Sequence, residues 1–287
     1  MSSHDSDNQG NSRRGTPWHW KAPGLETDGQ AGLLYEPGNW GDLLKDAWVI
    51  RIVEACSRAD RVAAFRILDP FAGRPCYRLS ESARARVAAV TDAGLSERLS
   101  HYGARDTFPS SGLLALNVAT ATGLDARLRV FDGDRERLEQ WRSVKNVEVL
   151  EAHSGVDALN DHRDADLVLV DPYDLFDHFR AILDACLPLA ATRPVLFYLY
   201  NKAPRSQGHV EQYGAFRRAL ARGIASASGA AAALVGRIPS DADLPRASHE
   251  VIVAAPAVLL KSLCSELKCV TIGLGAAIPG RGAFEEI

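Results

Sequence analysis

The sequence predicts an α/β protein in which an open, mostly parallel sheet carries helices on both faces. Short apolar or β-branched runs recur along the chain, and stretches with apolar residues at helical spacing lie between them. Several of the short runs are almost continuously apolar, as are strands that are covered on both faces. This alternation of strands and helices is typical of a parallel sheet.

Composition places the chain among ordinary globular proteins. It has 287 residues, of which 46% are hydrophobic and 24% are charged, enough for one large domain or two small ones. The net charge of −3 and the pI near 6.2 give no global electrostatic reason to expect a polyanionic partner.

Cysteine usage and the absence of long apolar runs predict a compartment. The five cysteines are scattered and lack metal-ligand spacing, which fits a reducing environment. No apolar run approaches about 18 residues, and the N-terminus lacks the layout of a signal peptide. We therefore expect a cytoplasmic protein with no membrane association and no metal site.

The N-terminal segment differs in composition from the rest of the chain. Residues 1–30 are rich in Ser, Asp, Asn, Gly and Arg, which predicts a disordered tail ahead of one domain over 31–287. Trp18 and Trp20 lie in this tail. They either belong to a loosely held segment or dock on the body and close over a site, and the sequence leaves the two readings open.

The first predicted element is a helix that begins near Gly41. Asn39 is a suitable N-cap, and Asp42 is an acidic residue in the first turn. The apolar residues at helical spacing are Leu44, Ala47, Trp48 and Ile52.

The predicted strands follow in order, with helical patterns between them. The strands are expected at Ala64–Leu68, Leu128–Phe131, Val147–Leu150, Leu167–Val170, Val195–Leu199, Ala232–Val235 and Val251–Ala254. Helical spacing is evident around Phe176 to Leu187 and Val210 to Leu220. Residues 80–125 interrupt the alternation with helical material, which we expect to form an inserted helical subdomain.

Polar or acidic residues follow four consecutive predicted strands. Asp69 follows the first strand, and Phe71 and Gly73 lie in the loop behind it. The other strand ends carry Asp132 and Asp134 (second), His153 and Ser154 (third), and Asp171, Tyr173 and Asp174 (fourth). Each group taken alone is equally consistent with a solvated turn or a helix cap. Because ligands bind at the carboxyl ends of strands in such sheets, the four groups together predict a ligand site.

The residue types at these strand ends indicate which ligand is expected. The loop "DPFAGRP" has one glycine and two prolines, whereas a phosphate cradle needs several backbone N–H donors. An acidic side chain at the end of the second strand can accept hydrogen bonds from ribose hydroxyls, and another near the first loop can face a cation. S-adenosylmethionine fits this combination because it has a ribose and two cationic groups but no phosphate.

Six segments of the chain, taken in order, resemble a known family. The chain resembles the bacterial S-adenosylmethionine-dependent methyltransferases that modify the exocyclic amine of an adenine in large-subunit ribosomal RNA. The segments are "EPGNWGDLLKDAW" (36–48), "ILDPFAGRPCYRL" (67–79), "FPSSGLLAL" (108–116), "RVFDGDRERL" (129–138), "LVLVDPYDLFDHF" (167–179) and "HEVIVAAPAVLLKSL" (249–263). The resemblance implies a class I methyltransferase-like, Rossmann-like fold, with a helical insertion after the first strand and S-adenosylmethionine as cofactor.

The resemblance also implies roles for individual residues. It assigns Lys45 to the methionine carboxylate, Asp69 and Gly73 to the cofactor loop, Ser111 to the methionine end, Asp132 to the ribose and Ser154 to the adenine amine. Asp134 is the alternative ribose contact. A lysine on a solvated helix face is the alternative reading of Lys45, and His153 is read as a loop residue.

The fourth strand end departs from the family pattern. Members of the family carry Asp-Pro-Pro-Tyr, whereas this chain has Asp171-Pro172-Tyr173-Asp174. One proline fewer moves the backbone acceptor and re-aims the tyrosine, which argues against an in-plane clamp on a flipped adenine. Asp171 and Tyr173 are the candidate catalytic residues, with a turn cap and a core tyrosine as the alternative. Tyr200 and Asn201 are further candidates for the same pocket wall.

Three functions are consistent with this pattern. The first is methyl transfer to an amine nitrogen of a small molecule or a nucleobase. In the second, S-adenosylmethionine is itself the substrate and is cyclised to an azetidine amino acid, releasing methylthioadenosine. The third is a cofactor-binding regulator without activity. A small-molecule substrate is the expected partner, because the net charge of the chain does not favour RNA binding. The local basic cluster that could contact RNA is Arg217, Arg218 and Arg222 on one helix.

Overall fold

A computed structural model describes residues 26–27, 34–59, 64–90, 107–172, 175–201, 207–227, 229–240, 247–278 and 282–287. Within them, β1 (Glu26–Thr27) pairs antiparallel with β2 (Leu34–Tyr35). The predictions about Trp18, Trp20 and most of the 1–30 segment lie outside the described residues.

The described residues form a central eight-stranded sheet in the order β12-β10-β11-β9-β8-β3-β6-β7. Its strands are β3 (Phe65–Asp69), β6 (Ala126–Val130), β7 (Val147–Val149), β8 (Leu167–Val170), β9 (Val195–Asn201), β10 (Ala231–Pro239), β11 (Ser248–Pro256) and β12 (Ala283–Glu286). All seven strands predicted from the sequence are present, each within a few residues of its expected bounds.

Within this sheet, β3, β6, β7, β8 and β9 pair in parallel, and the three C-terminal strands pair antiparallel. β3 pairs with β6 and β8, β6 with β7, and β8 with β9, all in parallel register. β11 is antiparallel to both β9 and β10, and β12 is antiparallel to β10. The chain leaves β3 toward β6 on one side and later returns to β8 on the other. The carboxyl end of β3 is therefore a topological switch point, where ligands bind in such sheets.

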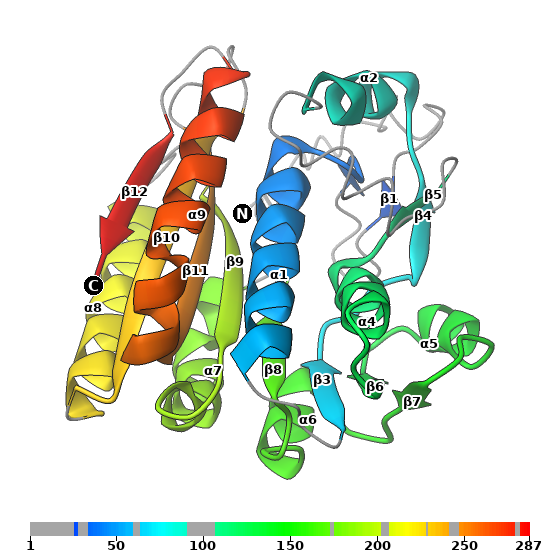
Figure 1. The fold of residues 1–287 in the computed structure, drawn as a ribbon, viewed down its shortest axis with the longest axis horizontal. Coiled ribbons are helices and arrows are strands. Elements are labelled where there is room, and N and C mark those ends of the chain that lie inside the picture. Colours follow the sequence, from blue (N-terminus) through cyan, green and yellow to red (C-terminus); the bar gives the residue numbers. More distant parts are fainter. Residues whose placement is uncertain are drawn as a thin grey trace, which may run out of the picture.

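Helices cover both faces of the sheet, as predicted (Figure 1). One core holds residues of α1 (Trp40–Ala59), α4 (Ser111–Ala121) and α9 (Ala257–Ala276), and the other those of α6 (Gly155–Asp161), α7 (Leu175–Ala190) and α8 (Gln207–Ser226). Successive strand residues alternate between the two cores, with Ile67 in the first and Leu68 in the second. This period-two alternation explains why the strands read as continuous apolar runs.

The long helix α1 runs through the first core and delivers polar residues to the switch point. Its N-cap is Asn39, as predicted, because the side-chain oxygen accepts the backbone N–H groups of Gly41 at 2.7 Å and Asp42 at 3.1 Å. α1 packs against α4 on one side and α9 on the other (Figure 1). Since most of α1 is thereby covered, even its charged residues Lys45 and Asp46 are buried.

The segment between β3 and β6 contains β4 (Cys76–Arg78), α2 (Glu81–Ala89), β5 (Thr107–Pro109) and α4. β4 and β5 form a separate two-stranded antiparallel sheet. α4 lies against β3 and β6 and contributes Leu114 and Ala115 to the first core. This helix therefore has the place of the crossover between two parallel strands. α2 lies farther out, where Arg86 joins it to Glu36 at 3.0 Å.

None of the described helices combines the length and the apolar character that a membrane span requires.

Candidate functional site

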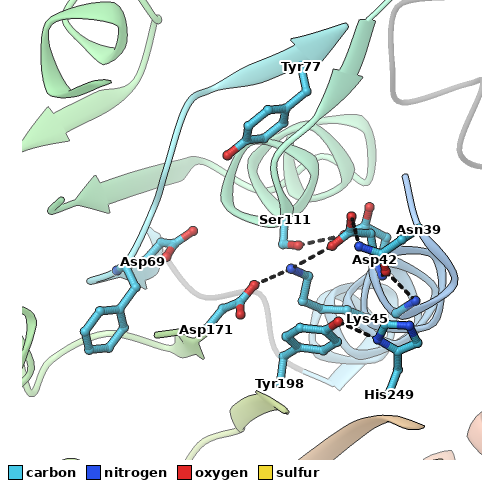
Figure 2. A network of polar contacts seen from close by, with 12 residues as sticks. Asn39, Asp42, Lys45, Asp69, Tyr77, Ser111, Asp171, Tyr198 and His249 are labelled. Carbon is cyan, nitrogen blue, oxygen red and sulfur yellow. Dashed lines mark hydrogen bonds and ion pairs between the residues drawn. The ribbon is translucent and has the colours of Figure 1, made fainter. Parts of the chain in front are cut away.

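Polar side chains gather at the carboxyl ends of β3 and β8, next to the first two turns of α1 and the start of α4. Figure 2 shows the polar ends of Asp69, Tyr77, Ser111, Lys45 and Asp171 turned toward a common region. They come from five different elements or loops, which the switch point brings together. Of the residues predicted for the site, Lys45, Asp69, Ser111 and Asp171 meet here.

Lys45 is the cation of this cluster. Its ammonium group pairs with Asp171, lies 3.5 Å from Asp42 Oδ1, and sits over the ring of Tyr198 at 4.8 Å from the centroid. Burial alone would lower the pKa of Lys45, but the carboxylates of Asp171, Asp42 and Asp46 raise it well above its usual value. Lys45 is therefore a buried ammonium held by carboxylates, and the reading as a solvated helix lysine is wrong.

Tyr198 packs against Lys45, and His249 is bound to Tyr198. The Tyr198 hydroxyl and His249 Nδ1 share a hydrogen bond of 2.7 Å. A Cβ atom at Gly41 would lie 2.2 Å from the Tyr198 hydroxyl, so only glycine allows α1 to approach this pair. Burial, followed by the charges of Lys45 and Arg86, lowers the pKa of His249 to about 3. The imidazole is therefore neutral at physiological pH and acts as a fixed polar support.

Asp46 is fully buried and only half satisfied. Its Oδ1 accepts a hydrogen bond from the Ser111 hydroxyl at 2.7 Å, while its buried Oδ2 has no hydrogen-bond partner among the described residues. Burial raises the pKa of Asp46 to about 7, with Lys45 opposing the shift and the neighbouring Asp42 adding to it. The site therefore holds a carboxyl group that is ready to accept a donor.

Asp69 is the second carboxyl group of raised pKa. It is 4% exposed, and its Oδ1 accepts the backbone N–H of Phe71 at 3.3 Å. A Cβ atom at Gly112 would lie 2.7 Å from Asp69 Oδ2, so the missing side chain lets the carboxyl group approach the start of α4. Burial raises the pKa of Asp69 to about 7, and the charge of Asp171 adds to the effect. Among the described residues of the site, carboxyl groups thus outnumber the ammonium of Lys45, an arrangement that favours a cationic ligand.

The loop after β3 is fixed to the end of β6. Gly73 has a φ of +61°, and its backbone N–H donates to Asp132 Oδ2 at 2.9 Å. A Cβ atom at this position would lie 2.3 Å from the Tyr77 hydroxyl. Asp132 also accepts the backbone N–H of Asp134 at 2.8 Å through Oδ1. Gly73 is therefore required for both its conformation and its space, and a ribose contact by Asp132 stays a prediction.

Asp134 and Ser154 both cap helices. Asp134 is the N-cap of α5 (Arg135–Trp141) and accepts the backbone N–H of Glu136 at 2.8 Å. Ser154 is the N-cap of α6, where it accepts the N–H of Asp157 at 3.2 Å and donates to its carboxylate at 2.8 Å. The capping alternative thus holds for both residues, and a cofactor contact by Ser154 stays a prediction.

Of the two predicted catalytic residues, Asp171 is among the described residues and Tyr173 is not. The Asp171 side chain is 32% exposed and bound to Lys45, so it lies at the site. Tyr173 and Asp174 lie outside the described residues. Tyr200 stacks on His249 with a centroid distance of 5.0 Å, and Asn201 is the last residue of β9.

The sequence motifs do not point to five residues of this cluster, namely Asp42, Asp46, Tyr77, Tyr198 and His249. A signal was present for the first two, because positions 42, 45 and 46 have the i, i+3, i+4 spacing of one helix face. Three charged residues on one face of the otherwise apolar first half of this helix indicate a buried polar site.

The arginine cluster on α8 is partly structural. Glu250 is fully buried and is held by Arg237 at 2.6 Å, by Tyr213 at 2.8 Å and by Arg217 at 3.3 Å. Arg217 also pairs with Glu285 at 2.8 Å. Its charge therefore serves this ion-pair network, which weakens its case as an RNA contact.

Comparison with known proteins supports the fold. No protein-family model and no curated protein matches the sequence. Among solved structures, protein LPL1258 from Legionella pneumophila str. Philadelphia 1, described by family-model DUF519, matches with a TM-score of 0.67 and 16% identity over 88% of this chain and 98% of that chain. The chain thus shares the fold of that protein, a Rossmann-like α/β sheet, mostly parallel, with helices on both faces.

A second similar structure is more distant. A probable spermidine synthase from Corynebacterium glutamicum ATCC 13032 matches with a TM-score of 0.49 and 11% identity over 91% of this chain and 86% of that chain. Because no family model matches the chain, the resemblance to the ribosomal RNA methyltransferases stays a prediction.

Proposed function

We propose that the chain is an S-adenosylmethionine-dependent enzyme that alkylates an amine nitrogen, in the first place by transferring a methyl group to an amine of a small molecule or a nucleobase. The observation that carries this proposal is the charge of the site. At the topological switch point, Asp42 and Asp171 pair with the ammonium of Lys45, and the buried carboxyl groups of Asp46 and Asp69 lie near it, so carboxyl groups are in excess among the described residues. A site of this charge favours a cationic ligand and disfavours a nucleotide phosphate.

The residues present fit S-adenosylmethionine. Asp132 lies at the end of β6 beside the backbone of Gly73, where it can accept ribose hydroxyls. The excess of carboxyl groups suits the sulfonium and the ammonium of the methionine portion. The start of α4, an anion site in phosphate-binding folds, is already capped by Ser110 and approached by the Asp69 carboxyl group.

S-adenosylmethionine supplies, when bound, a carbon that an amine nitrogen can attack while the carbon–sulfur bond breaks and its electron pair returns to sulfur. The task of the chain is to hold a nitrogen lone pair in line with that bond. Asp171 is the candidate acceptor for an N–H of the nucleophile, and Lys45 fixes its carboxylate. We retain Tyr173 as a second catalytic candidate on the sequence argument alone.

One observation favours a second candidate function. The Oδ2 atom of Asp171 is already bound by the ammonium of Lys45, which competes with the amine of an external base for that oxygen. An amine that belongs to S-adenosylmethionine itself needs no separate acceptor subsite. The alternative is therefore cyclisation of S-adenosylmethionine to an azetidine amino acid with release of methylthioadenosine.

The reaction products decide between these functions. The protein is incubated with S-adenosylmethionine, with and without candidate amines, and both adenosine products are followed by mass spectrometry. Amine-dependent S-adenosylhomocysteine supports methyl transfer, whereas methylthioadenosine formed without any added amine, together with the azetidine amino acid, supports cyclisation. Cofactor binding without either product points to a regulator and contradicts the enzymatic proposal.

The ribose contact gives the first quantitative prediction. Asp132→Ala is expected to weaken S-adenosylhomocysteine binding by about ten- to a hundredfold, because charged hydrogen bonds contribute roughly 1.5–3 kcal/mol. Isothermal titration calorimetry measures the affinity. Asp134→Ala serves as the control, since Asp134 caps α5 and is expected to leave the affinity within a few fold. The opposite result would move the ribose contact to Asp134.

We further propose a cytoplasmic enzyme with a small-molecule substrate. The described cysteines are all free, as in a reducing compartment. An RNA substrate has weaker support, because Arg217 is engaged with Glu250 and Glu285 and the net charge is −3.

A further inference from the structure

We infer that Asp46 is the receptor for a primary ammonium group, namely the α-ammonium of the methionine portion of S-adenosylmethionine. The inference rests on the proposed function, because it concerns how the proposed ligand is oriented. It assigns a binding role to a residue that neither the sequence motifs nor the resemblance singles out.

The first support is the unpartnered oxygen of Asp46. The residue is fully buried, and its Oδ2 has no hydrogen-bond partner in the part of the chain that the structure describes, although burial of an unpaired carboxylate oxygen is costly. Ser111 has one hydroxyl hydrogen and donates it to Oδ1. A donor from outside the chain is therefore the simplest way to satisfy Oδ2.

The second support is that nearby donors are already committed. The ammonium of Lys45 pairs with Asp171 and lies 3.5 Å from Asp42. The hydroxyl of Tyr198 shares its hydrogen bond with His249. In the described part of the chain, these nearby donors therefore bind acceptors other than Asp46 Oδ2.

The charges around Asp46 indicate what kind of donor fits. Asp42 on the same helix and Asp171 at the end of β8 add negative charge, and Lys45 is the cation that offsets it. A neutral donor would satisfy the hydrogen bond but leave this excess, whereas an ammonium supplies both donor and charge. The described residues offer no group of three or more His, Cys, Asp or Glu side chains that could hold a metal ion instead.

An α-amino acid group has a matching arrangement of charges. Its ammonium and carboxylate are attached to one carbon, and Asp46 and Lys45 are consecutive buried residues of opposite charge on α1. The Lys45 ammonium has three N–H donors, of which two face Asp171 and Asp42, so one is left for a carboxylate. The pair can therefore offer complementary charges to the two groups of the zwitterion, with Ser111 holding the Asp46 carboxylate in place.

The test compares ligands with and without the ammonium, and it needs no turnover. On the unaltered protein, calorimetry compares S-adenosylhomocysteine with its analogue that carries hydrogen in place of the α-amino group. We expect the analogue to bind at least about tenfold more weakly, since a charged hydrogen bond of roughly 1.5–3 kcal/mol is lost. Asp46→Asn should reduce this preference to about twofold or less and leave methylthioadenosine, which lacks the amino acid portion, within about twofold.

The outcomes separate this inference from the proposed function. Equal affinities for S-adenosylhomocysteine and the deaminated analogue on the unaltered protein would overturn it, as would a preference that Asp46→Asn leaves intact. Failure of the unaltered protein to bind S-adenosylhomocysteine at all would instead contradict the proposed function. Asp161→Asn, on the exposed end of α6, is the matched control and should behave like the unaltered protein.

Discussion

Replacement of Lys45 by methionine is expected to lower the free energy of unfolding by about 2–4 kcal/mol at neutral pH, because removal of one partner from a buried ion pair leaves an uncompensated charge. Methionine keeps the length of the side chain but removes the cation from among Asp171, Asp42 and Asp46. The estimate lies toward the lower end for buried pairs, since the Asp171 side chain is 32% exposed.

The loss should depend on pH in a defined direction. The pKa values of Asp46 and Asp69 are raised to about 7 in the folded protein, from a usual value near 3.8. The folded state therefore binds more protons than the unfolded state between these values, and the contribution of these groups to stability falls as pH rises through that range. Without Lys45 the carboxylates repel each other more strongly, so the effect of Lys45→Met should be larger near about pH 8 than near about pH 5.

Urea unfolding at the two pH values measures this difference. Lys261→Met is the matched control, because Lys261 is an exposed lysine on α9 and the same substitution there should change stability by less than about 0.5 kcal/mol. An equal loss at both pH values would mean that Lys45 contributes through packing and not through its charge.

Asp171→Asn is expected to lower turnover by at least about tenfold while it leaves S-adenosylhomocysteine affinity within a few fold, the pattern of a group that acts mainly in the transition state. Asparagine keeps the shape of the side chain but cannot carry the charge that Lys45 holds in place. Steady-state kinetics gives kcat, and calorimetry gives the affinity. We expect Tyr173→Ala to follow the same pattern.

Two results would contradict this assignment. Full turnover in Asp171→Asn would make its loop structural, and a parallel loss of affinity and turnover would make Asp171 a ligand-binding residue. Asp184→Asn, an exposed aspartate on α7, controls for the loss of one surface charge and should keep full activity.

Local features of the fold could be predicted from the sequence because local forces determine them. The apolar runs give the strands, and the side chain of Asn39 caps α1 as its position predicts. The strand ends also point to the edge where Asp69, Asp132 and Asp171 lie. Strand order and the antiparallel pairing of β11 with β9 depend on the tertiary fold, and no local pattern specifies them.

The interior of the site could not be predicted in the same way. Asp46 is buried because α1 packs between α4 and α9, a fact of tertiary packing. Tyr198 and His249 lie on neighbouring strands, and their hydrogen bond forms only once β9 and β11 pair. Ser154 shows the converse limit, because a residue type that suits a ligand contact also suits the helix cap that it forms.

The two carboxyl groups of raised pKa make ligand binding an exchange of cations. With pKa values of about 7, Asp46 and Asp69 each hold part of a proton in the free protein at neutral pH. A positively charged ligand beside them favours the ionised form and displaces those protons. Protons therefore compete with a cationic ligand for these two carboxyl groups, so its affinity falls as the pH falls. The affinity of a neutral nucleoside does not depend on pH in this way. Occupancy by a cation would then follow the proton concentration of the surroundings as well as the supply of ligand.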